Sequence, residues 1–126
     1  MKYKSLIYGL SVIMLLTGCA DIDYALKGYH VVAIHDGNST EIEPAAVNVV
    51  FDRNANQLPM CVNSKPIAEV SVPTYDLWGG LYDRETITYN FKKAASAVGG
   101  NHIVNIVTGV NDGDGSLMLV GYALNC

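Results

Sequence analysis

The stretch DRETITYNFKKAASAVGG, residues 83–100, decides the fold of this 126-residue chain. Asp83 is a favourable helix N-cap, and Glu85 places a negative charge in the positive first turn. Gly99 and Gly100 follow as a stop signal. Apolar residues recur at helical spacing and form one stripe, made of Ile87, Phe91, Ala94, Ala95 and Val98. The stretch therefore predicts one amphipathic helix that needs a sheet to cover its apolar face.

Apolar, β-rich runs flank this helix on both sides. Residues 46–51 and 67–72 precede it, and the second run alternates until Pro73 ends it. Residues 102–107 and 117–124 follow it and are joined by the Gly/Asp-rich turn 111–116, as in a hairpin. The order ββαββ predicts an α+β domain, with an antiparallel sheet of about four strands and one helix packed on it. Residues 29–34 are a further candidate for an edge strand.

The N-terminus has the layout of a secretory signal peptide. Lys2 and Lys4 precede an apolar run, residues 6–16, that is too short for the ~20 residues of a membrane-spanning helix. Leu16-Thr17-Gly18-Cys19 then resembles the lipobox of bacterial lipoproteins. The alternatives are an uncleaved membrane helix and an ordinary signal peptide with a cysteine near its cleavage site.

The lipobox resemblance implies that Cys19 becomes the first residue of the mature protein and carries acyl chains. One chain alone gives marginal membrane binding, so several chains make a stable anchor. Ala20, in place of Asp, implies transport to the outer membrane in enteric bacteria. We therefore expect a signal peptide over 1–18, a lipid-anchored tether over 19–45 and an α+β domain over 46–126.

The net charge of −4 becomes −4 − 2 = −6 when Lys2 and Lys4 are removed with the signal peptide. A mildly acidic chain with no cluster of Lys and Arg is unsuited to nucleic acid. It is equally unsuited to electrostatic adhesion to anionic lipid. The expected membrane contact is the set of acyl chains on Cys19.

Three cysteines occur in the chain. If Cys19 is acylated, Cys61 and Cys126 form an even pair, and an oxidising periplasm favours a disulfide between them. Closing a loop of this length stabilises a small domain by roughly 4 kcal/mol. The alternative is two free buried thiols.

The order of these features resembles the Rcs stress-sensor lipoproteins, the RcsF-like family. The resemblance rests on Cys61 after a loop, the Val-x-Val strand end at Val70 and Val72, and the run from Ala95 through Gly99-Gly100-Asn-His-Ile-Val. The ending Gly121-Tyr-Ala-Leu-Asn-Cys126 is its most specific part, and in the family the final cysteine bonds to an earlier one. The resemblance implies a periplasmic α+β domain on an outer-membrane anchor that signals through protein contacts. This chain lacks the second cysteine pair and the long Pro-rich tether of the sensor itself.

These features predict a non-enzymatic outer-membrane lipoprotein whose periplasmic domain binds an envelope protein, with stress sensing as the role that the resemblance implies. The alternatives are a structural accessory subunit of an envelope or secretion complex, and a lipoprotein that binds a small ligand or a metal. No spacing of Ser, His and acidic residues indicates a catalytic triad. We expect neither an enzyme nor a cofactor.

The loop between the second strand and the helix is the candidate interaction site. It holds five large apolar or aromatic residues, which are Tyr75, Leu77, Trp78, Leu81 and Tyr82. Aromatic residues in a surface loop can anchor a partner protein. In the interpretation that we favour, Trp78 instead folds down to cover the helix–sheet core.

Metal sites are not predicted. Asp112 and Asp114 match part of a calcium-binding loop, but Val110 and Gly121 stand where its first and last carboxylates belong, so a hairpin turn is favoured. The three histidines, His30, His35 and His102, have no neighbours at metal-ligand spacing. A zinc site would need them to converge with carboxylates or Cys61. We expect surface or cap histidines.

Overall fold

The computed structural model describes residues 27–34, 41–76, 78–111 and 115–126. The signal peptide, Cys19, His35, Leu77, Asp112 and Asp114 lie outside these residues. Within the described ranges, no helix has the length and apolar character needed to cross a bilayer.

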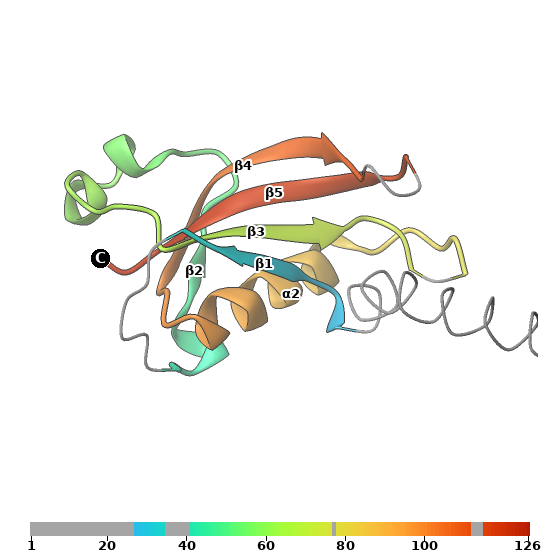
Figure 1. The fold of residues 1–126 in the computed structure, drawn as a ribbon, viewed down its shortest axis with the longest axis horizontal. Coiled ribbons are helices and arrows are strands. Elements are labelled where there is room, and N and C mark those ends of the chain that lie inside the picture. The colour runs from blue at the N-terminus through green and yellow to red at the C-terminus, as the bar shows by residue number, and fades with distance from the viewer. Residues whose placement is uncertain (1–26, 35–40, 77, 112–114) are drawn as a thin grey trace, which may run out of the picture.

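The sheet has five strands in the order β1-β3-β5-β4-β2. The strands are β1 (His30–Ala33), β2 (Asn48–Val49), β3 (Ala68–Pro73), β4 (His102–Val110) and β5 (Leu117–Leu124). The helix α2 (Arg84–Ala97) lies across one face of the sheet, and three 3-10 turns over Pro44–Ala46, Ala55–Gln57 and Pro59–Cys61 complete the described elements (Figure 1). The structure confirms a single α+β domain, with one α-helix packed on the sheet in the ranges described. The sheet is mixed rather than antiparallel, because β2 pairs parallel to β4. It has five strands rather than about four, because β1 adds one at the edge.

One edge of the sheet confirms the candidate edge strand at 29–34, and the other edge differs from the expected plan. β1 pairs antiparallel with β3, from His30 opposite Ser71 to Ala33 opposite Ala68. Part of the segment that we expect to be a tether therefore belongs to the sheet. The expected strand 46–51 narrows to Asn48–Val49, because a 3-10 turn begins at Pro44 and Phe51 turns inward to meet Phe91 of α2 with ring centroids 6.3 Å apart.

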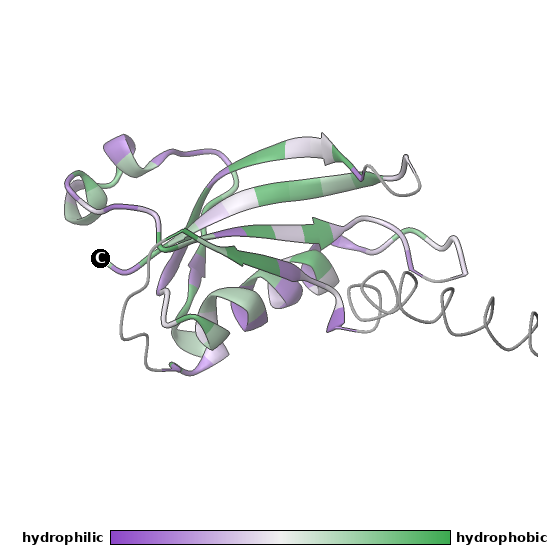
Figure 2. Ribbon diagram, in the orientation of Figure 1, coloured by the Kyte–Doolittle hydropathy of each residue, from purple (hydrophilic) through white to green (hydrophobic). Residues whose placement is uncertain are grey.

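The helix begins and ends as its caps predict. The Asp83 carboxylate accepts a hydrogen bond from the Thr86 N–H at 2.8 Å, and its hydrogen bonds with Thr86 lower the pKa of the Asp83 carboxyl. At the other end, the Gly100 N–H donates to the Ala95 carbonyl at 2.8 Å. Most of the predicted stripe is buried, namely Ile87, Phe91, Ala94 and Ala95, and among the strands α2 packs mainly against β3, β2 and β4. Figure 2 shows apolar residues concentrated along the strands and polar residues in the loops and on outer turns of α2.

A β-bulge interrupts β4 between Val104 and Val107. Asn105, inside the bulge, has a φ of 57°, a left-handed conformation that Asn tolerates better than most residues. Opposite it, a Cβ on Gly121 would lie 2.8 Å from Ile103 Cγ2, so only glycine fits there. Among the described residues, β2 pairs with β4 before the bulge, at His102 and Ile103.

Candidate functional site

The loop between β3 and α2 is a small, hydrogen-bonded hairpin. A β-bridge joins Tyr75 to Leu81, and the Tyr82 N–H donates to the Thr74 carbonyl at 2.8 Å. The hairpin therefore continues past the end of β3 as an ordered projection.

Asp76 organises the tip of this hairpin. Its Oδ1 accepts hydrogen bonds from the N–H groups of Trp78 at 2.9 Å and Gly80 at 2.7 Å. The Asp76 N–H donates in turn to the Gly80 carbonyl at 2.8 Å, and Gly79 adopts the positive φ of 80° that the turn requires. The backbone at Trp78 is thus fixed in place before any partner binds.

The tip presents large apolar side chains to solvent. Trp78 is 94% exposed and Leu81 is 72% exposed. The favoured expectation that Trp78 covers the helix–sheet core is therefore wrong. The hairpin extends beyond the sheet, and α2 already covers the core with Ile87 and Phe91. Tyr82, by contrast, packs partly buried against the core, and Leu77 lies outside the described residues.

The apolar surface continues from this tip onto the neighbouring strands. The Thr74 hydroxyl donates to the Leu117 carbonyl at 2.7 Å and so joins the hairpin to β5. Leu117 and its partner on β4, Val110, are both exposed. We call residues 74–76 and 78–82 together with Val110 and Leu117 the hairpin end of the domain.

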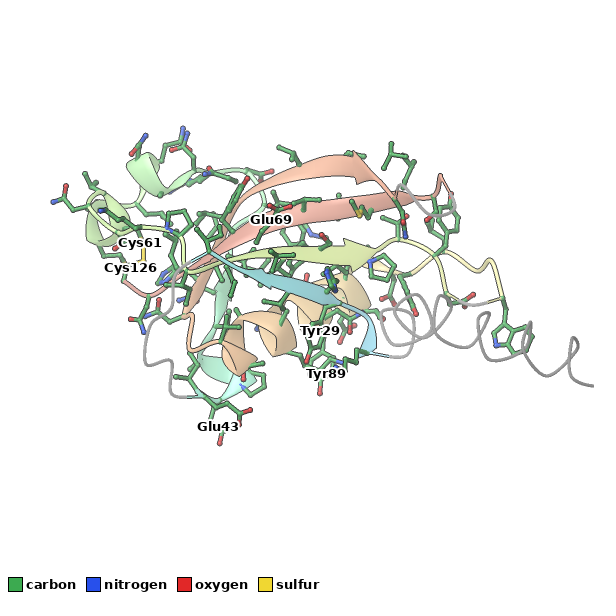
Figure 3. The ribbon with its side chains drawn as sticks, viewed as in Figure 1. Tyr29, Glu43, Cys61, Glu69, Tyr89 and Cys126 are labelled. Atoms are coloured by element: carbon green, nitrogen blue, oxygen red, sulfur yellow. A yellow bond between two sulfur atoms is a disulfide. The ribbon has the colours of Figure 1, made fainter. Side chains whose placement is uncertain are left out.

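The opposite end of the sheet is closed by the cysteines. The Sγ atoms of Cys61 and Cys126 lie 1.93 Å apart, at disulfide-bonding distance (Figure 3). Asn101 holds the terminal residue through two hydrogen bonds, from Cys126 N–H to Asn101 Oδ1 at 2.9 Å and from Asn101 Nδ2 to the Cys126 carbonyl at 3.0 Å. We call Cys61, Asn101, His102 and Cys126 the clasp end.

His102 lies inside the clasp end. Its Nδ1 is 2.8 Å from Asn101 Oδ1 and 3.4 Å from Cys126 Sγ, and the residue is 6% exposed. Burial lowers the pKa of the His102 imidazole, which favours the neutral form. The expectation of a surface or cap histidine is wrong at this position, because β4 carries His102 beneath the C-terminus. His30 is exposed on β1, and His35 lies outside the described residues.

The clasp end is also where three side chains of metal-ligating types converge. Cys61, His102 and Cys126 bring their ligand atoms within 4.8 Å of one another. Metals bind cysteine as thiolate. The sulfurs of Cys61 and Cys126 are not thiolates while they form a disulfide. In that state the His102 nitrogen is the one atom of this group that could bind a metal. The acidic turn over 112–114 lies outside the described residues.

Comparisons with known proteins establish neither a family nor an activity for this chain. No family model matches the chain, and neither does any curated protein. A matching solved structure is the crystal structure of a Francisella virulence factor, FvfA, which is 16% identical. The match covers 78% of this chain and 97% of that chain, with a TM-score of 0.49. At this identity and TM-score, the likeness carries no argument about function.

Two features of the domain surface are not predicted from the sequence. The first is Asp76, whose position just before Trp78 and the Gly79-Gly80 pair is a signal for an Asx turn. The second is a groove between β4 and the start of α2, lined in part by Phe51, Arg84 and Ile106. No local signal marks this groove, because its walls come from four separate segments.

Proposed function

We propose that this chain is a non-enzymatic lipoprotein of the bacterial outer membrane whose domain binds a partner protein through the hairpin end. The observation that carries the proposal is the exposure of Trp78, the one tryptophan of the chain, at the tip of an ordered hairpin. Tryptophan is enriched among residues that dominate binding energy. A rigid backbone lowers the entropy lost on binding.

The path of the chain supports a partner close to the membrane. Since His30 pairs with Ser71 near the end of β3, the described chain enters the sheet at the hairpin end (Figure 1). Cys19 precedes Lys27 by 27 − 19 = 8 residues, which span at most about 29 Å. An acyl anchor on Cys19 would therefore keep the hairpin end on the membrane side of the domain. The periplasmic rim of a membrane protein would meet it there.

Site-specific photocrosslinking in cells tests this proposal. A photoreactive phenylalanine replaces Trp78 in the acylated protein, and a matched variant carries it at Tyr89, which is an exposed aromatic residue on α2. We expect a discrete protein adduct from position 78 and none from position 89. Adducts to phospholipid alone at position 78, or equal protein adducts at both positions, would overturn the proposal.

The same adduct separates a stress sensor from an accessory subunit. A sensor gives an adduct whose yield changes with envelope stress, whereas an accessory subunit gives a constant, stoichiometric complex. The anchor has its own test, since the intact mass of the membrane-extracted protein should show loss of residues 1–18 and acyl chains on Cys19. An unacylated mature chain would remove the membrane part of the proposal.

A further inference from the structure

The outer edge of β4 is open beyond its short pairing with β2. The two strands pair at Asn48 with His102 and at Val49 with Ile103. The chain after β2 makes two further backbone hydrogen bonds to this edge, from the Val50 N–H to the Ile103 carbonyl at 2.9 Å and from the Asn105 N–H to the Arg53 carbonyl at 3.3 Å. In the described ranges, no strand pairs with this edge from Ile106 to Val110.

The ladder with β5 fixes which main-chain groups face this open edge. The Asn111 N–H donates to the Ser116 carbonyl at 2.8 Å, so residues 111 and 116 form a hydrogen-bonded pair. Bonded and non-bonded pairs alternate along an antiparallel ladder. Val107 and Gly109 therefore bond to β5, while Thr108 and Val110 direct their N–H and C=O groups outward.

This edge lacks the usual protection against pairing with another strand. Soluble proteins place charges, prolines, bulges or covering segments on their edge strands. From Ile106 to Val110 the edge has no charged residue and no proline, and it lies beyond the bulge at Asn105. Val107 and Val110 are 60% and 55% exposed.

A groove of about 460 Å³ lies beside the open edge, on the side of the sheet that α2 covers. Its lining is mainly apolar, with Phe51, Ile87, Ile106 and Leu119, and Asp52 and Arg84 are its charged residues. The Arg84 guanidinium lies 4.6 Å from the centre of the Phe51 ring. A strand added to β4 would point every second side chain toward this groove.

We propose that the edge of β4 from Ile106 to Val110 binds an extended segment of a partner protein by strand addition. Main-chain bonds to Thr108 and Val110 would supply affinity, and alternate apolar side chains in the groove would supply specificity. This inference rests on the proposed function and names the chemistry of its partner. A second copy of the chain fits less well, because two edges of about 17 Å alone bury far less than the ~1,200 Å² of a stable interface.

The test uses a displayed library of random peptides of about eight residues, selected against the full-length, detergent-extracted protein. Enriched peptides should alternate apolar and polar residues. Their binding should slow amide hydrogen exchange at 106–110. Thr108→Pro, which removes the outward N–H, should weaken binding about tenfold or more, whereas Thr108→Val keeps the N–H and should bind as the parent does.

Ala33→Pro is the matched control on the opposite edge. The Ile34 N–H donates to the Ile67 carbonyl at 2.9 Å, so by the same alternation Ala33 directs its N–H outward from β1. We expect this variant to bind the peptides normally. Circular dichroism and urea unfolding test whether both proline variants are folded. Amide hydrogen exchange in the parent protein locates the binding site even if a proline variant does not fold.

Several results would overturn the inference. They are an absence of enriched peptides, exchange protection centred on another surface, equal losses from Thr108→Pro and Thr108→Val, or self-association that Thr108→Pro abolishes. The outcome is separable from the proposed function. Peptide binding at β4 with no cellular adduct from position 78 would refute the proposed function and support the edge site. A cellular adduct from position 78 with no peptide binding at β4 would support the proposed function and refute the edge site.

Discussion

At the clasp end, a buried cysteine, a buried histidine and a hydrogen-bonded asparagine fix the last residue of the chain, whereas at the hairpin end a tryptophan and a leucine stand in water. The two ends belong to the same strands, since β5 runs from Leu117 at the hairpin end to Leu124 beside the clasp. Interactions that stabilise a fold bury apolar side chains and give buried polar groups their hydrogen-bond partners. A binding surface leaves apolar groups exposed until a partner arrives. The difference suggests that one end carries stability and the other carries recognition.

Removing the disulfide should produce the largest effect and should act through the clasp end. In a Cys61→Ala, Cys126→Ala double variant, the unfolded chain regains the freedom of a loop with a sequence separation of 65. We expect the free energy of unfolding to fall by roughly 4 kcal/mol, measured by urea denaturation. The emission of Trp78 in the folded protein should not change. A loss of stability below about 1 kcal/mol would show that the clasp does not carry this role.

Asn101→Ala breaks the clasp without touching the disulfide. It removes two hydrogen bonds to the main chain of Cys126 and leaves that partly buried N–H without its acceptor. We expect a loss of about 1–3 kcal/mol in the same denaturation assay. Asn125→Ala is the control, because Asn125 donates a single hydrogen bond, to the Gly99 carbonyl at 2.8 Å, and should cost less. Equal losses would mean that Asn101 has no special role.

The part of this architecture that local signals encode is predictable from the sequence. Asp83, the apolar stripe and Gly99-Gly100 define α2, and the turn 111–116 defines the hairpin of β4 and β5, because each signal acts within a few residues. The pair at the clasp end is indicated by the resemblance to a family with a C-terminal disulfide and by the two cysteines that remain if Cys19 is acylated. These features need no knowledge of the rest of the fold.

The features that the sequence does not predict depend on distant segments. Trp78 is exposed because α2 already covers the core, and His102 is buried because the C-terminus closes over it. The open edge of β4 depends on where β2 stops, since β2 pairs with β4 at His102 and Ile103 and ends at Val49. In each case the residue and the segment that determines its exposure are far apart in the sequence, so no short stretch of sequence contains both.

The pH dependence of stability should report on the clasp end through His102. Burial lowers the pKa of the folded imidazole below the unfolded value of 6.5. As the pH falls through 6.5, the unfolded state takes up a proton before the folded state does, so this contribution is complete above that value and is lost below it. We expect a lower urea midpoint at about pH 5.5 than at about pH 7.5, with a smaller change than Asn101→Ala causes.

His102→Asn isolates this contribution. The variant should lose the difference between the two pH values, whatever its stability at neutral pH. Asp83 does not interfere, since its lowered pKa places its titration below the ordinary carboxyl value of 3.8. An unchanged pH difference in the variant would assign it to another group.

Asp76→Ala should have the smallest effect on stability and the clearest effect on the hairpin end. The change removes the acceptor that fixes the N–H groups of Trp78 and Gly80, but neither residue belongs to the core. We expect the free energy of unfolding to stay within about 0.5 kcal/mol of the parent value. The fluorescence anisotropy of Trp78 should fall, because the indole sits on a backbone that is no longer held.

Glu43→Ala is the matched control, since it removes an exposed carboxylate far from the hairpin (Figure 3). Its anisotropy should equal that of the parent protein. Because the chain has one tryptophan, the signal reports on the hairpin alone. If Asp76→Ala destabilises the whole domain as much as Asn101→Ala does, the hairpin is part of the cooperative fold. The contrast between a stabilising end and a recognition end would then fail.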